Sequence, residues 1–243
     1  MLAGGVFATQ GGNPAMAGFD ADGSDARAIA IADEVMAALG GRAAWDDTRF
    51  LTWSFFGRRT HVWDKQSGDL RYDDGDRLVL MNLNTKEGKV FENGQELEGA
   101  AKDEALHDTE SAWINDSYWV FMPYKLKDTG VTLKYAGTGS TAAGESADIL
   151  ELTFKGVGRT PDNKYHVYVE ESSRLVTQWD YYQVATDAEP RFQIPWKDWQ
   201  RKGSILLSAN RGERQHENVA VLEDVPETVF RSPEPVDLLD YAK

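Results

Sequence analysis

Apolar and polar residues alternate along most of this chain, and this spacing of two constrains its fold more than any other feature. In one run, Leu51, Trp53 and Phe55 share one parity, with Thr52 and Ser54 between them. Strands are also predicted at residues 61–63, 78–83, 89–92, 150–154, 165–169, 175–183, 192–196, 205–207 and 219–221. Successive side chains of a strand point to opposite faces, so alternation predicts strands with one buried face. Short, turn-rich connections predict antiparallel pairing in a sheet large enough to curl.

Two stretches carry a helical spacing instead. Ser24 is a predicted N-cap, and apolar residues then recur every three or four positions from Ala28 to Leu39. Two glycines at 40–41 end this pattern, which predicts an amphipathic helix of about 15 residues. A second helical spacing within residues 100–119 is followed by an aromatic stretch that ends at a proline. It predicts a helix inserted between β segments, with a loop that packs back onto the sheet.

The composition excludes several classes of protein. The chain has 243 residues, a net charge of −14 and no cysteine. Disulfides, thiol chemistry and Cys-ligated metals are therefore excluded. The acidity argues against nucleic acid as a partner, because binding to phosphates needs a basic surface. No run approaches the ~20 apolar residues that a spanning helix requires, so we expect a protein that does not span the membrane.

The domain organisation is predicted to be simple. Residues 1–23 are rich in small and polar residues without any period, which predicts a flexible lead-in. Residues 24–231 form a single β domain, because all the predicted strands follow one another there without a linker. Residues 232–243 form a tail that holds two prolines. The first eight residues are mildly apolar but lack the basic segment of a signal peptide.

No familiar catalytic pattern is present. The chain contains no Gly-x-Ser-x-Gly elbow, no Gly-x-Gly-x-x-Gly and no P-loop. None of the four histidines lies within four residues of another, which excludes a helical zinc pair; they are His61, His107, His166 and His216. The acidic turn at 20–25 places its glycine at the fourth position, whereas an EF-hand loop needs it at the sixth. We therefore expect a protein that is not an enzyme and has no metal and no cofactor.

The aromatic residues are the strongest sign of a binding site. There are 8 Trp, 9 Tyr and 10 Phe, and on the predicted strands they share the parity of the other apolar residues. A curved sheet has one concave face, where large rings enclose a cavity more easily than they fill it. Ligand pockets are mostly apolar with a few polar anchors. The predicted lining consists of Trp53, Phe55, Trp63, Trp119, Trp179 and Tyr181.

The order of these elements resembles a known family. The predicted first helix ends in Leu-Gly-Gly at 39–41, and Trp45, a strand at 50–56 and the run His-Val-Trp-Asp at 61–64 follow. Later come Tyr-His-Val-Tyr-Val at 165–169, a long strand at 175–182 and Val-Pro-Glu-Thr-Val-Phe at 225–230. This succession, which covers roughly residues 25–231, resembles the LolA/LolB-like superfamily of envelope lipoprotein carriers.

The resemblance implies a fold and a function. The fold is mainly β (α+β): a curved antiparallel sheet that forms an unclosed β-barrel, with helices plugging its concave face. The implied function is non-enzymatic binding or carriage of a lipid, an acyl chain or another hydrophobic small molecule in the periplasm or cell envelope. A lipoprotein is a further partner that the resemblance implies.

Two other functions stay open at the level of sequence. A carbohydrate-binding or hydrolytic β-sandwich would use exposed, coplanar aromatic rings to stack on sugars, and a carboxylate pair for chemistry. A structural envelope protein would have a filled core and no ligand. The orientation of the aromatic rings and the presence of a cavity distinguish these functions from a carrier.

Overall fold

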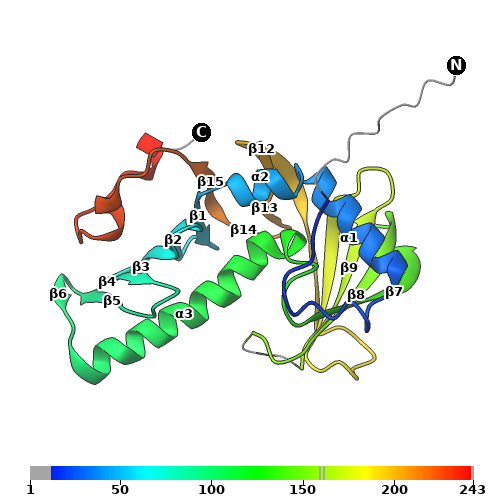
Figure 1. Cartoon of the computed structure of the whole chain (residues 1–243), viewed down its shortest axis with the longest axis horizontal. Coiled ribbons are helices and arrows are strands. Elements are labelled where there is room, and N and C mark those ends of the chain that lie inside the picture. The colour runs from blue at the N-terminus through cyan, green and yellow to red at the C-terminus, as the bar shows by residue number, and fades with distance from the viewer. Residues whose placement is uncertain (1–11, 159, 161, 242–243) are drawn as a thin grey trace, which may run out of the picture.

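The computed structural model describes residues 12–158, 160 and 162–241, and this part of the chain is built mainly from antiparallel strands (Figure 1). The largest sheet contains β1 (Phe50–Phe55), β2 (Arg59–Asp64), β3 (Asp69–Asp74), β4 (Arg77–Asn82), β5 (Gly88–Glu92), β6 (Gln95–Glu96) and β15 (Glu217–Leu222). Its order is β15–β1–β2–β3–β4–β5–β6. All its strands except β15 are therefore neighbours in sequence as well as in space.

Two further sheets complete the layer. The second contains β7 (Val131–Ser140), β8 (Ser146–Phe154), β9 (Lys164–Glu170), β10 (Val176–Tyr182) and β11 (Phe192–Pro195), in the order β11–β10–β9–β8–β7. The third contains β12 (Lys197–Lys202), β13 (Ile205–Arg211) and β14 (Arg214–Gln215). Strand β13 contacts both β15 and β11, so the small sheet joins the two large ones. Within the described residues no pairing joins β6 to β7, and the barrel is unclosed.

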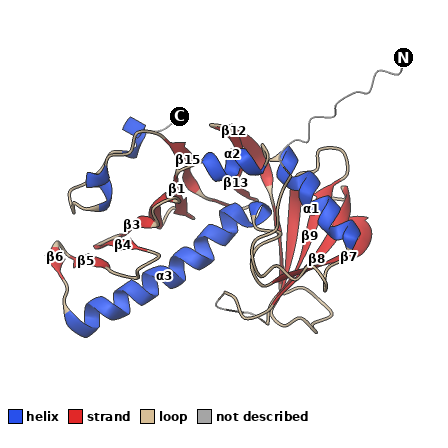
Figure 2. Cartoon of the chain, in the orientation of Figure 1, coloured by secondary structure: helices blue, strands red, loops and turns tan. Residues whose placement is uncertain are grey.

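The helical elements are α1 (Ala26–Ala38), α2 (Arg42–Asp47), α3 (Gly99–Phe121) and the 3-10 turns η1 (Met122–Tyr124), η2 (Glu227–Phe230) and η3 (Leu238–Tyr241). The α-helices and η1 pack on the face of the sheets that carries Leu51 and Trp53, whereas η2 and η3 pack with Phe50 and Val62 on the opposite face of the seven-stranded sheet. Helix α3 contacts β4, β5 and β13, and it extends from the seven-stranded sheet toward the five-stranded one (Figure 2). Helix α1 contacts β7 and η1. None of the described helices is long and apolar enough to cross a membrane.

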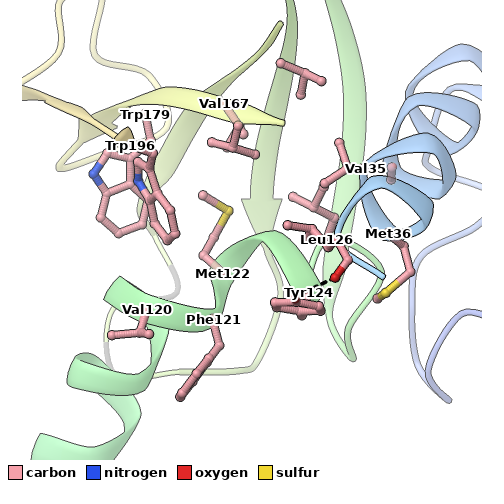
Figure 3. Packing of buried hydrophobic residues seen from close by; sticks show 14 of the residues in the cluster. Val35, Met36, Val120, Phe121, Met122, Tyr124, Leu126, Val167, Trp179 and Trp196 are labelled. Atoms are coloured by element: carbon pink, nitrogen blue, oxygen red, sulfur yellow. Dashed lines mark hydrogen bonds between the residues drawn. The ribbon is translucent and has the colours of Figure 1, made fainter. Parts of the chain in front are cut away.

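The main core lies where the end of α3 meets the sheets. Figure 3 shows Met122 pointing toward Trp179 and Trp196, Phe121 pointing away from them, and Val35 and Met36 of α1 on the other side. All of these side chains are almost fully buried. The Tyr124 hydroxyl donates a hydrogen bond to the Leu206 carbonyl at 2.6 Å and so fixes η1 to β13. Because each fully buried large side chain contributes roughly 1.5–3 kcal/mol, this cluster is a main source of stability.

These observations confirm the predicted fold class and most of the predicted elements. The structure is mainly β, antiparallel and unclosed, with one long helix against the sheets. The predicted helices correspond to α1 and α3, and each predicted run of alternation lies in a strand. The N-cap prediction at Ser24 is wrong, because α1 begins at Ala26 with Asp25 as its N-cap. The Ser24 hydroxyl instead accepts the N–H of Leu133 in β7.

The segment before α1 runs beside the edge strand β7. The Asp20 N–H donates to the Val131 carbonyl at 3.0 Å, and the Gly130 N–H donates to the Gly18 carbonyl at 2.8 Å. An uncovered edge strand is a template for aggregation, and these hydrogen bonds cover part of β7. Residues 1–11 of the predicted lead-in lie outside the described residues. In the predicted tail, Tyr241 packs against a small apolar cluster around Phe230.

A glycine at the end of α1 permits a close contact between backbones. Gly40 has φ +118°, and a Cβ there would lie 2.5 Å from the Ser204 carbonyl oxygen. Gly41 also has a positive φ, of +91°, but no heavy atom lies within 4 Å of its Cβ position. We expect Gly40→Ala to lower the free energy of unfolding by about 1 kcal/mol more than Gly41→Ala, since only the first adds a clash to the backbone strain. Urea melts of both variants measure the difference, and equal losses would contradict this role of Gly40.

Candidate ligand cavity

A cavity of about 400 Å³ lies between the second half of α3 and the ends of the strands β7–β9. Its wall combines residues of α3, of the loop 125–130, of β7–β9 and of the loop after β8. The described lining residues are Met16, Trp113, Ile114, Asn115, Ser117, Tyr118, Trp119, Lys125, Asp128, Thr129, Val131, Phe154, Val157, Gly158, Thr160 and Tyr165. Most of this wall is apolar or aromatic, as is usual for small-molecule sites.

Because of the helical period, some side chains of α3 face the cavity and others face the core. Trp113, Ser117 and Tyr118 fall on the cavity side at spacings of four and five. Asp116 faces the seven-stranded sheet instead, where the guanidinium of Arg59 donates hydrogen bonds to its two carboxylate oxygens at 2.6 and 2.8 Å. This ion pair fixes the rotation of the helix and therefore the side chains that it presents to the cavity.

His61 completes the contact between Asp116 and the sheet. Its Nε2 lies 2.9 Å from a carboxylate oxygen of Asp116, and its ring stacks on Trp53 at 4.5 Å. Burial lowers the pKa of His61, although the Asp116 carboxylate opposes this effect. Burial also opposes ionisation of Asp116, but hydrogen bonds from His61 and Arg59 hold its pKa below the usual value. Both side chains are fully buried, so this group acts as a structural clamp and not as an acid–base pair open to substrate.

The strands supply the opposite wall. Val131 and Phe154 are paired partners at the ends of β7 and β8. Tyr165 of β9 pairs with Leu152 of β8, two residues before Phe154, so Phe154 and Tyr165 lie on the same face of the sheet. Their rings are 5.8 Å apart and perpendicular. The wall of strands is therefore an aromatic surface opposite the rings of α3.

Two donors in the wall have no partner. The Tyr118 hydroxyl and the Trp113 indole N–H are buried and make no hydrogen bond to any described residue. Burial raises the pKa of Tyr118 well above its usual value, and the neighbouring Tyr165 and Asp128 add to this effect. The phenol is therefore neutral and keeps its proton. Other buried polar atoms of the described chain also lack a partner, among them the indole nitrogens of Trp53, Trp179 and Trp196.

The charges in the described wall cancel. Lys125 and Asp128 are three residues apart, and the ammonium of Lys125 lies 2.7 Å from a carboxylate oxygen of Asp128. Both side chains are about one-third exposed. Met16, on the segment before α1, lies at the same cavity and is one of the two large hydrophobic side chains that the described part of the chain exposes. The cavity thus has a charged but electrically balanced group beside an apolar interior.

Of the six predicted lining residues, the structure places Trp119 in the wall of the cavity. Four others are not in the wall but have a ring against that of a wall residue. Trp179 contacts Tyr118, Trp119 and Tyr165, while Trp63 contacts Trp113, Tyr181 contacts Tyr165 and Phe55 contacts Trp119. Trp53 is fully buried in the core between His61 and Phe121. Of the six predicted residues, one thus lines the cavity, four contact its lining residues, and Trp53 makes its ring contacts elsewhere.

Sequence reasoning missed most of the wall. Ser117 and Tyr118 carry no signal besides the helical period, since their place depends on how α3 is rotated. Val157 and Thr160 lie in the loop after β8, and no pattern of the sequence connects a loop with a helix so distant along the chain. The aromatic stretch near the end of α3 was the one signal that pointed to this place.

The remaining polar clusters do not form a second cavity site. On β8–β10, His166 contacts Glu151 at 3.2 Å and the Tyr182 hydroxyl at 3.1 Å. Glu151 and Phe154 differ in parity, so this cluster lies on the face of the sheet opposite the cavity. The described residues contain no group of three His, Asp or Glu that could hold a metal ion.

Comparisons with known proteins give matches among solved structures. No protein-family model matches the chain, and no curated protein matches it. A DUF1329 family protein of Desulfovibrio piger is 13% identical, with a TM-score of 0.41, over 84% of this chain and 96% of that one. A LolA superfamily protein of Nitrosomonas europaea is 10% identical, with a TM-score of 0.34 over the same shares. A Vibrio parahaemolyticus domain described as an outer membrane lipoprotein-sorting protein is 7% identical, with a TM-score of 0.41, also over these shares. The chain is thus similar to solved structures of a DUF1329 family protein, a LolA superfamily protein and a lipoprotein-sorting domain, at low sequence identity.

Proposed function

We propose that this protein binds a lipid or another hydrophobic molecule in the cavity and carries it without covalent chemistry. One observation supports this above all others, namely a cavity of about 400 Å³ walled by aromatic and aliphatic side chains. Its volume falls within the range of roughly 300–1,000 Å³ that is usual for ligand sites.

The affinity of such a site comes from apolar burial. Each buried methylene group contributes about 0.8 kcal/mol, and a chain of a dozen carbons therefore gains several kcal/mol after the loss of its freedom is subtracted. Packing against rings such as Trp119 and Phe154 adds dispersion contacts. We expect affinity to increase with chain length until the cavity is full.

Native mass spectrometry of the purified protein, combined with organic extraction, tests the proposal directly. We expect a reproducible mass excess that extracts as a fatty acid, a phospholipid or another apolar molecule. An unchanged mass after incubation with lipids and fatty acids would count heavily against ligand binding, and glycan screening would follow.

A variant that fills the cavity tests whether binding occurs there. Val157 lies in the wall, and we expect Val157→Trp to weaken binding of a fluorescent fatty acid by about tenfold or more, since the indole would occupy the space of several methylene groups. Val184→Trp is the matched control, because Val184 is 43% exposed and lies outside the wall. Titrations of both variants measure the difference. Equal affinities would place the ligand elsewhere.

The two other functions receive less support. A sugar-binding face needs exposed rings, whereas the large hydrophobic side chains exposed in the described part of the chain are Met16 and Val184, and neither is aromatic. A purely structural protein needs no apolar cavity of this kind. The finer parts of the proposal are a location in the periplasm or cell envelope and a lipoprotein as the source or recipient of the ligand. They follow from the resemblance of the sequence, and localisation of the tagged protein by cell fractionation tests the first of them.

A further inference from the structure

We infer that the cavity takes a single acyl chain of about a dozen carbons, so its ligand is an amphiphile with one chain, such as a fatty acid or a lysophospholipid, and not a lipid with two or more chains. The inference rests on the proposed function, because it names the class of ligand for the same cavity. Three features of the described wall support it: the volume that it encloses, the ring contacts between its two sides, and an exposed charged pair.

The volume of the cavity limits how much of a lipid can enter. A methylene group occupies about the same volume as a water molecule in the liquid, about 30 Å³. The cavity of about 400 Å³ therefore holds about a dozen such groups. Two chains of ten carbons each would need about 600 Å³, which exceeds the space that the wall encloses.

Ring contacts join the two sides of the cavity. Tyr118 belongs to the wall of α3, and its ring centroid lies 5.7 Å from that of Tyr165 and 6.2 Å from that of Phe154 in the wall of strands. Trp179 is not in the lining but stacks on Tyr165 at 5.0 Å. A wider cavity would separate these rings, and packed interiors resist such a movement.

Contacts with the seven-stranded sheet also hold α3 in place. Asp116 accepts two hydrogen bonds from the guanidinium of Arg59 at 2.6 and 2.8 Å, and Trp113 packs edge-to-face against Trp63 at 5.1 Å. The carboxylate of Asp116 is fully buried, so a displacement of α3 that broke this ion pair would be costly. A second chain therefore gains no room from a movement of the helix.

The charged residues of the wall lie where the cavity meets water. Lys125 and Asp128 are each about one-third exposed, whereas Val131 of the same wall is buried. Met16 is 43% exposed, and its N–H donates to the Lys127 carbonyl at 3.0 Å, next to this pair. A head group at this place keeps its hydration, because it does not enter the apolar interior. An amphiphile with one chain fits this arrangement, with its chain inside and its head group at the exposed pair.

Saturated fatty acids of eight to eighteen carbons measure the length of chain that the cavity holds. Their binding is followed by displacement of a fluorescent fatty acid from the natural protein. We expect each added carbon to tighten binding by about threefold to fourfold at first, because each one is buried in the cavity. Beyond about fourteen carbons, the additional carbons extend into water, and each should change the affinity by less than about twofold.

Two probes with the same head group separate one chain from two. Dodecanoyl lysophosphatidylcholine has one chain of twelve carbons, and didecanoyl phosphatidylcholine has two chains of ten. The second probe has more apolar carbon, so an open apolar surface would bind it more tightly. We expect the natural protein to bind the single-chain probe at least about tenfold more tightly, with both probes below their micelle concentrations. Native mass spectrometry should find one molecule of it on each protein.

A variant that enlarges the cavity should move the length limit. Phe154 lies in the wall, and Phe154→Ala should raise the chain length at which affinity levels off by about three carbons, since the lost ring leaves about that volume. Phe91→Ala is the matched control and should leave the limit unchanged, because Phe91 is a half-buried residue of β5 outside the wall.

Three results would overturn the inference: affinity that rises steadily to eighteen carbons, equal or tighter binding of didecanoyl phosphatidylcholine, or an unchanged length limit in Phe154→Ala. The first two measurements use the natural protein, so they do not depend on the folding of a variant. Each of the three results would leave the proposed function standing. Failure of every probe to bind would overturn both.

Discussion

Replacing Arg211 by methionine is expected to lower the free energy of unfolding by about 3 kcal/mol. The guanidinium is buried and donates five hydrogen bonds, to the carbonyl oxygens of Trp119, Ser208 and Asn210 and to the Ser208 hydroxyl. It also lies 3.5 Å from the centre of the Trp196 ring. Methionine preserves much of the volume but leaves these acceptors inside the protein without donors.

The sequence around Trp119 explains why a cation is needed there. Trp119 is in the last turn of α3, and its carbonyl would normally accept the N–H of the residue four positions later. That residue is Pro123, which has no N–H. Arg211 supplies the missing donor at 2.6 and 3.2 Å, at the helix end where the partial charge is negative. The helix end thus serves as the counter-charge that a buried arginine requires.

The loss of the charge has an opposing effect, because burial disfavours the cation and lowers the pKa of Arg211. Replacing a buried ion pair as a whole is often neutral, but here the main-chain acceptors stay behind, so destabilisation should prevail. Arg214→Met is the matched control, since Arg214 is exposed and lies over the Phe56 ring at 5.6 Å; it should cost under about 1 kcal/mol. Denaturant melts compare the two variants. An unchanged midpoint for Arg211→Met would mean that water satisfies the freed carbonyls.

The sequence predicts the sheet well where one face of a strand is buried and the other is solvated. The alternation of Leu150 and Leu152 with Glu151 marks β8 correctly, and the helical spacing after Ala28 marks α1. The pattern is weaker in β7, where Gly137 and Gly139 stand in a ten-residue strand. It is also weaker in β12, whose six residues include four charged ones. Neighbouring strands define these two elements, and a single run of sequence carries little of that information.

The site was predictable only in part, for a different physical reason. An aromatic residue on the inner face of a strand contributes to a filled core or to a cavity wall, and the sequence pattern is the same for both. Trp53 fills space against Phe121, whereas Trp119 borders the cavity. The difference depends on the position of α3, which the partly buried ion pair between Arg59 and Asp116 determines across 57 residues of sequence. Such long-range pairs leave no local signal.

The protein is expected to lose about 2 kcal/mol of unfolding free energy between pH 7.5 and pH 5 because of His216 alone. Burial, followed by the nearby positive charge of Arg211, lowers the pKa of His216 to about 3 from an ordinary value of 6.5. Neither ring nitrogen has a hydrogen-bond partner in the described structure, and the ring stacks on Phe56 at 4.4 Å. The folded protein therefore holds this imidazole neutral.

The direction of the effect follows from the lowered pKa. Below about pH 6.5 the unfolded chain takes up a proton on His216 that the folded protein does not, so each further unit of acidity favours unfolding until the folded pKa is reached. His61, whose pKa burial also lowers, acts in the same direction. The carboxyl groups with lowered pKa values, such as Asp116 and Asp148, lose their stabilising effect on the folded protein only when the pH falls below about 4. The interval from pH 5 to pH 7.5 therefore reports mainly on the buried histidines.

His216→Phe isolates this contribution, because phenylalanine keeps the stack on Phe56 and cannot bind a proton. The variant should match the natural protein within about 1 kcal/mol at pH 7.5 and be relatively more stable by about 2 kcal/mol at pH 5. His107→Phe, at an exposed position of α3, is the matched control and should retain the loss seen in the natural protein. Guanidinium melts at several pH values across this interval measure how the unfolding free energy of each variant changes with pH. If the unfolding free energy depended on pH equally in the natural protein and in His216→Phe, the folded protein would have to accept the proton on His216. Water or an acceptor would then have to reach a ring that Phe55, Phe56 and Arg211 enclose.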